Sequence, residues 1–166
     1  MDKKKVKSLI IFYSYEGNTR FIAQTMAKAI NADILELKPK KDMKSKGFMK
    51  YVWGGRKVVF KQKPELEPFN VNLDDYDLLV FGTPVWAFTF TPALRSFFSR
   101  FSVEHKKVAV FCCHEGGMGK TVENMLSELK ENNMIGTNDF YHPLCKDKEE
   151  SEKKAKAWVK ELISKV

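Results

Sequence analysis

Residues 14–19 gather hydroxyl, glycine and amide groups in one short polar segment: Ser14, Tyr15, Glu16, Gly17, Asn18 and Thr19. An unbroken apolar run precedes this segment, and from Phe21 onward apolar residues recur at helical spacing. A loop between a buried strand and a helix presents backbone N–H groups, and the helix dipole adds positive potential. The chemistry expected there is the binding of an anion such as a phosphate. The alternative is an ordinary turn capped by Asn18 or Thr19.

Two further segments follow apolar runs and carry complementary side chains. One is aromatic and comprises Thr83, Pro84, Val85, Trp86, Ala87 and Phe88. The other is polar and rich in glycine, and comprises Cys113, His114, Glu115, Gly116 and Gly117. Together with the first segment they would suit a ligand that has an anionic tail and a flat aromatic head.

Two other chemistries match parts of the third segment. Residues 116–121 imitate a nucleotide-triphosphate loop, but the pattern G-x-x-x-x-G-K-[ST] needs glycine where His114 stands. Cys113 and His114 would suit a thiol hydrolase, yet adjacent residues of an extended segment point to opposite sides and pair poorly. The cysteines at 112, 113 and 145 have no zinc-ligand spacing. We therefore assign no catalytic residue and no metal site.

Strand and helix patterns alternate along the chain and would position these segments. Continuous apolar runs, typical of strands buried on both faces, cover residues 9–13, 78–82 and 108–113. An edge strand is predicted at 32–37 and a weaker strand at 134–141. Helices are predicted from 21, across 43–63, from 92, around 122–129 and around 155–166. The alternation implies a parallel sheet with a ligand site beyond the carboxyl ends of its strands.

Length and composition indicate one folded domain over residues 1–166, with 43% hydrophobic and 13% aromatic residues. The chain shows neither a transmembrane stretch nor a signal peptide, and its cysteines are few, so we expect a cytoplasmic protein without a membrane partner. The formal net charge is +8, much of it in residues 3–7, 38–63 and the last helix. Because no nucleic-acid-binding motif accompanies this charge, we expect a solvated basic face and no nucleic-acid partner.

Nearly the whole chain resembles the flavodoxin family. Residues 14–19 resemble the family's phosphate loop, a hydroxyl residue followed by a T-G-x-T-like run, with Glu16 where threonine is usual. Residues 82–88 resemble the loop that packs an aromatic ring on the flavin, and residues 113–117 resemble the loop whose amides reach the flavin's pyrimidine edge. The resemblance implies FMN as cofactor and an α/β fold. That fold is a doubly wound five-stranded parallel sheet, order 2-1-3-4-5, with helices on both faces.

The resemblance also implies roles for individual residues of the first loop. Ser14, Thr19 and the N–H groups of Gly17 and Asn18 would hold the phosphate, while Glu16 would point away from it. The neighbouring Arg20 would either assist or lie solvated on the helix.

In the other two loops, Trp86 would stack on the flavin ring, or else be a core residue. Gly116 and Gly117 would allow the backbone to approach the ligand closely. His114 would stand near the ring or lie at the surface.

The resemblance leaves the reaction open. One hypothesis is electron transfer to a redox partner protein, which would be acidic to dock on this basic chain unless electrostatic steering is weak. The alternative is an NAD(P)H-dependent, FMN-containing reductase of quinones or other small acceptors, favoured weakly by the lack of glycine in residues 83–88. A scaffold without cofactor is a third option. Trp53 with Gly54 and Gly55 would form a lid, a dimer contact or ordinary packing, so a homodimer also stays open.

Overall fold

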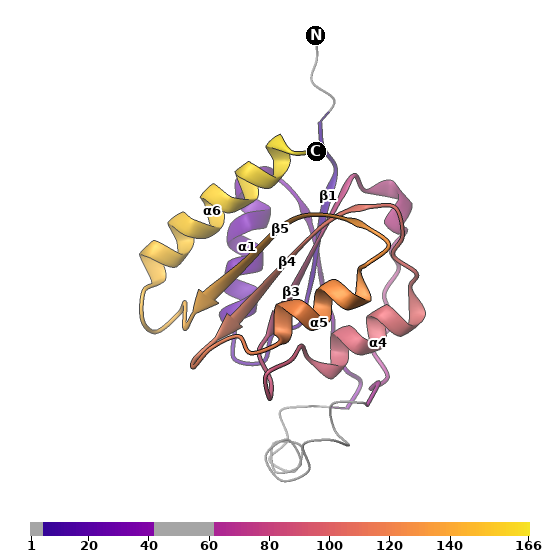
Figure 1. Cartoon of the computed structure of the whole chain (residues 1–166), viewed down its shortest axis with the longest axis horizontal. Coiled ribbons are helices and arrows are strands. Elements are labelled where there is room, and N and C mark those ends of the chain that lie inside the picture. The colour runs from indigo at the N-terminus through magenta and orange to yellow at the C-terminus, as the bar shows by residue number, and fades with distance from the viewer. Residues whose placement is uncertain (1–4, 42–61) are drawn as a thin grey trace.

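A computed structural model describes residues 5–41 and 62–166 of the chain. Its sheet contains five parallel strands: β1 Ser8–Phe12, β2 Asp33–Glu36, β3 Leu78–Pro84, β4 Lys107–His114 and β5 Asn133–Tyr141. They lie in the order β2-β1-β3-β4-β5 (Figure 1). The predicted fold class and strand order are confirmed.

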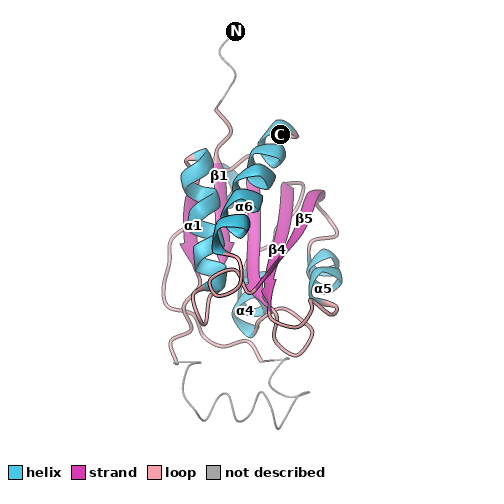
Figure 2. Cartoon of the chain, turned by 90° about the vertical axis from the view of Figure 1, so that its left-hand side faces the viewer, coloured by secondary structure: helices cyan, strands magenta, loops and turns pink. Residues whose placement is uncertain are grey.

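Helices cover both faces of this sheet (Figures 1 and 2). The described helices are α1 Asn18–Ile30, α4 Pro92–Arg100, α5 Thr121–Glu128 and α6 Lys148–Ser164, with a 3₁₀ turn η1 at Leu73–Asp75. On one face α1 and α6 pack side by side, and α4 and α5 cover the other. Of the helices described, none is both long enough and apolar enough to span a membrane.

Alternate residues of the central strands pack on opposite faces, which explains why their sequences are continuously apolar. In β1, Leu9 and Ile11 join the core beneath α4 and α5, while Ile10 and Phe12 join the core beneath α1 and α6. All four side chains are buried. The strand is therefore held from both sides, and the loop that follows it starts from a fixed position.

Two strands run further than the sequence predicts. β3 continues to Pro84 because Thr83 and Pro84 still pair with Cys112 and Cys113 of β4. β4 likewise extends by one residue to His114, which places that histidine on a strand end instead of in a loop. The helix predicted at 43–63, with Trp53, Gly54 and Gly55, lies outside the described residues except for 62 and 63, which are not helical.

Candidate functional site

The carboxyl ends of β1, β3 and β4 lie next to one another, at the point where the strand order reverses. Ligands bind at this position in open parallel sheets, because loops there can diverge and leave room between them. The three strand ends and the loops after them contain all the residues predicted for the site. The sheet thus brings the three predicted segments to one edge.

The first loop presents unsatisfied backbone donors at the start of α1. Gly17 precedes the helix with φ +102°, a left-handed conformation that glycine adopts without strain. The N–H of Phe21 donates to the Gly17 carbonyl at 2.9 Å and closes the first helical turn. Within the described part of the chain, the N–H groups of residues 15–19 donate to no protein acceptor. Such a set of donors at a helix N-terminus is suited to binding an anion.

Side chains of this loop hold it from inside. The buried Ser14 hydroxyl accepts a hydrogen bond from the Arg20 N–H at 3.1 Å, so its own hydrogen can still be donated. Thr19 is buried near the Cys113 thiol, and its hydroxyl makes no hydrogen bond of ordinary geometry among the described residues. The Asn18 side-chain oxygen accepts from the Leu144 N–H at 3.0 Å. The loop is therefore tied both to α1 and to the segment between β5 and α6.

Two charged residues, Glu16 and Arg20, border these N–H groups. Glu16 is exposed, and its orientation away from a phosphate stays a prediction. The Arg20 guanidinium binds both carboxylate oxygens of Glu36 on β2, with Nε at 3.0 Å from Oε2. This hydrogen-bonded pairing raises the pKa of Arg20. Arg20 is thus paired with Glu36 and not solvated alone, so the positive potential of the loop comes from its backbone N–H groups and the helix dipole.

The second loop contains a tight turn with unusual backbone angles. Trp86 and Thr89 exchange two backbone hydrogen bonds, at 2.9 and 3.0 Å. Between them Ala87 and Phe88 have φ of 44° and 66°. Turns of this kind favour Asn-Gly, so a bulky residue in the second position is strained. The Phe88 side chain is 68% exposed. Strain of this sort gathers at functional sites, where the surrounding structure holds it in place.

Trp86 joins the first two loops. Its ring meets those of Tyr13 and Tyr15 edge-on, with centroids 5.5 and 5.6 Å apart and interplanar angles of 84° and 81°. The residue is half-buried, so it belongs partly to the core and partly to the surface of the site. Stacking of Trp86 on a flavin stays a prediction.

The third loop packs against the second. The Lys120 N–H donates to the Phe88 carbonyl at 2.9 Å. A side chain on Gly119 would place its Cβ 2.5 Å from the Phe88 Cβ and 2.8 Å from its Cα, so only glycine fits there. At Gly116 and Gly117, by contrast, an added Cβ would meet no described atom within 4 Å. The loop therefore contacts its neighbour at one end and leaves open space at the other.

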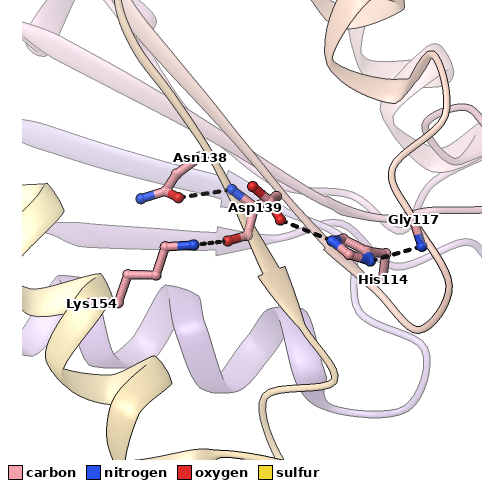
Figure 3. Close-up of polar contacts among 5 residues, drawn as sticks. All are labelled: His114, Gly117, Asn138, Asp139 and Lys154. Carbon is pink, nitrogen blue, oxygen red and sulfur yellow. Dashed lines mark hydrogen bonds and ion pairs between the residues drawn. The ribbon is translucent and has the colours of Figure 1, made fainter.

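His114 anchors this open end (Figure 3). Its Nε2 lies 2.9 Å from Oδ2 of Asp139 on β5, and its Nδ1 accepts a hydrogen bond from the Gly117 N–H at 3.0 Å. The imidazole is only 12% exposed, so it does not lie free at the surface. Both ring nitrogens are occupied by Asp139 and Gly117, which leaves neither to activate Cys113.

The cysteines of β4 are buried and unreactive. Burial, and to a smaller extent the nearby Asp139 carboxylate, raise the pKa of the Cys112 thiol to about 12. Burial also raises the pKa of Cys113 well above its usual range. Because the thiolate is the nucleophile, these thiols argue against a thiol hydrolase.

Residues 7–162 match the flavodoxin family. The chain belongs to that family. A search of curated proteins gave no match.

Solved structures share the fold of this flavodoxin-family chain. A flavoprotein of Lactobacillus acidophilus NCFM, solved in complex with FMN, is 22% identical with a TM-score of 0.67, covering 84% of this chain and 96% of its own. A protein of Bacteroides uniformis ATCC 8492 is 20% identical, with a TM-score of 0.78 and coverage of 95% and 99%. Oxidised Flavodoxin 2 from Bacillus cereus is 18% identical, with a TM-score of 0.62 and coverage of 96% and 99%.

Not every residue predicted for the site turns its side chain toward the loops. Thr83 is fully buried, and its hydroxyl donates to the Pro84 carbonyl at 2.8 Å and accepts from the Thr91 N–H at 3.2 Å. Cys113 is also buried, although its carbonyl accepts from the Val85 N–H at 2.9 Å. These residues shape the edge from within, whereas residues 15–18, Trp86, Phe88 and Glu115–Gly117 line its surface.

Sequence reasoning missed three residues that complete this edge. Asp139 and Leu144 come from β5 and from the segment after it, and no motif singles them out. Gly119 lies within the glycine-rich residues 116–121, but its contact with Phe88 depends on how the second and third loops meet. A signal for Asp139 exists only once the β4–β5 pairing is known.

Proposed function

We propose that this flavodoxin-family chain binds FMN at the carboxyl edge of its sheet and transfers electrons through it to a redox partner protein or a small acceptor. The observation that carries the proposal is the row of N–H groups at residues 15–19, which donate to no acceptor within the described residues. A phosphate monoester supplies acceptor oxygens and negative charge to such a site.

The first loop fits a phosphate on three grounds. Its donors stand at the positive end of α1. The Ser14 hydroxyl keeps a hydrogen to donate, because it already accepts from the Arg20 N–H. The Arg20 guanidinium is paired with Glu36, so the loop does not depend on a side-chain cation. The backbone can therefore hold the anion by itself.

The other two loops fit a flat, partly polar ring. Trp86 and the exposed Phe88 offer aromatic surface on one side. Gly116 and Gly117 offer backbone with no described atom in the space where a side chain would lie. The similar flavoprotein of Lactobacillus acidophilus was solved with FMN, which supports the same ligand here.

Bound FMN would supply the chemistry, which is the reversible uptake of one or two electrons. The chain's own residues would bind the phosphate, orient the ring and exclude water from one side of it. The formal charge of +8 favours an acidic partner protein, because complementary charge speeds association.

The first test compares FMN with riboflavin, which lacks the phosphate. Purified protein is incubated with each ligand, desalted, and measured by absorption and by flavin fluorescence. We expect retained FMN, and at least tenfold weaker binding of riboflavin, because charge-assisted hydrogen bonds contribute about 1.5–3 kcal/mol each. Equal affinities would contradict the phosphate site. Loss of both ligands would support the scaffold without cofactor.

An anaerobic titration with dithionite, followed by one with NADH or NADPH, separates the two redox roles. Reduction in two resolved one-electron steps would support a carrier between proteins. Direct two-electron bleaching by the nicotinamide alone would support the reductase of small acceptors.

A further inference from the structure

The hydrogen-bond pattern around His114 defines its tautomer (Figure 3). The Gly117 N–H is a donor, so Nδ1 of His114, 3.0 Å away, must present a lone pair. The proton of the neutral ring is then on Nε2, which donates to Oδ2 of Asp139 at 2.9 Å. The three groups form a chain that runs from a carboxylate on β5 to a backbone amide in the third loop.

The contact with Nδ1 holds the open end of this loop. Among the described residues, it is the only hydrogen bond made by the backbone of residues 116 and 117. Gly117 has φ +122°, and no described atom lies within 4 Å of the place where its Cβ would be. Packing therefore does little to define this segment, and the imidazole does most of it.

A second proton on His114 would act on the two contacts in opposite ways. With both nitrogens protonated, the imidazolium and the Asp139 carboxylate would form an ion pair, and the hydrogen bond from Nε2–H to that carboxylate would be strengthened. The Nδ1–H would face the Gly117 N–H, and two donors cannot share a hydrogen bond. The loop would have to release Gly117 while the ring stayed on Asp139.

Other ionisable groups surround the imidazole on every packed element. β5 contributes Asp139 and Tyr141, whose ring centroid lies 5.8 Å from that of His114. α6 contributes Lys154, which donates to the Asp139 carbonyl at 2.5 Å. Cys112 lies on β4, and Glu115 contacts His142 with Oε1 3.0 Å from Nε2. Asp139 is the anion in direct contact, and the lysine reaches only its backbone.

We propose that His114 is a positioning residue: with Asp139 it fixes the Gly117 amide and the third loop only while the imidazole is neutral, so that flavin affinity falls as the pH falls. This inference rests on the proposed function for its second half, since it names how that site is regulated. Histidine is the side chain suited to this role, because it ordinarily changes charge between pH 5 and 8.

The first half is tested on the unliganded protein by NMR with ¹⁵N-labelled histidine and glycine, from pH 5 to pH 8.5. At high pH we expect the Nε2–H tautomer of His114 and a hydrogen-bonded Gly117 amide. As His114 gains its second proton, the Gly117 amide should lose that bond with the same midpoint. Independent midpoints, or the Nδ1–H tautomer at high pH, would overturn the proposal.

The second half is tested by FMN fluorescence titration over the same range. We expect wild-type affinity to fall about fivefold from pH 8 to pH 5, the loss of one ordinary hydrogen bond. His114→Asn should lose the pH dependence, because its amide oxygen accepts from Gly117 at any pH. His114→Ala should bind weakly throughout.

His105→Asn is the matched control. His105 lies before β4, away from the loop, and its φ of 56° is one that asparagine tolerates. This variant should keep the wild-type pH profile. A profile that follows His105, or that survives in His114→Asn, would overturn the proposal. If FMN binds at no pH, the proposed function and the affinity claim both fail, while the NMR titration still decides whether His114 controls the loop.

Discussion

The first and third loops of the site are built in opposite ways. The first is held by internal contacts at Ser14, Asn18 and Thr19, and it presents backbone donors that no described group uses. The third has a backbone that spans open space at Gly116 and Gly117, and at that end it is held by the His114 imidazole. Several contacts therefore define the first loop before any ligand binds, whereas few contacts define the open end of the third.

Replacing Gly17 should disrupt the first loop and have the largest effect on FMN affinity. At φ +102°, Gly17→Val would force a β-branched residue into a left-handed conformation and redirect the neighbouring N–H groups. We expect FMN affinity to fall about a hundredfold, or roughly 2.7 kcal/mol, and riboflavin affinity to fall far less. Fluorescence titration measures both. Gly17→Asn, which tolerates positive φ better, should lose less, and equal losses for both ligands would contradict the role assigned to the loop.

Replacing Gly119 should disturb the third loop through its contact with the second. Gly119→Ala places Cβ 2.8 Å from the Phe88 Cα, so the backbone must shift. We expect the free energy of unfolding to fall by about 2 kcal/mol, as in other overpacked sites, measured by urea denaturation. FMN and riboflavin should weaken equally, unlike in Gly17→Val. Gly116→Ala, which has room for its methyl group, should unfold like the wild type.

The turn in the second loop offers a substitution that should raise stability instead of lowering it. Phe88→Gly relieves a φ of 66° and removes a side chain that is 68% exposed, so little burial is lost. We expect the free energy of unfolding to rise by about 1 kcal/mol. Flavin affinity should fall if Phe88 contributes aromatic surface to the site. A less stable variant would show that the ring packs better than its exposure indicates.

The smallest effect is expected at Arg20. Its guanidinium is bound to Glu36, and the pKa of Arg20 is raised by that hydrogen-bonded pair. We expect Arg20→Gln to change FMN affinity by no more than about twofold, because partly exposed pairs contribute little. A tenfold loss measured at low ionic strength would show that the side chain, and not only the backbone, serves the anion.

The sequence predicts the first loop better than the third, and for a physical reason. A continuous apolar strand, a glycine and a helix cap are local features, so residues 9–30 can be interpreted without their neighbours. The contact between His114 and Asp139 depends on strand register, in which Cys112 pairs with Asp139 and His114 with Tyr141. That register shifts at an irregularity between Val108 and Ala109, which no periodicity reveals. The sequence therefore predicts that the three loops meet at one edge of the sheet, but it does not predict that Asp139 is the partner of His114.

The hydrogen bond from the Leu144 N–H to the Asn18 side chain joins residues separated by 126 positions. Such a contact closes late, because the intervening chain must first be ordered. During synthesis from the N-terminus, the first loop emerges long before the residue that completes it. The first loop can therefore reach its final form only after β5 has docked on β4, and any cofactor that depends on this loop would be loaded onto a nearly finished fold.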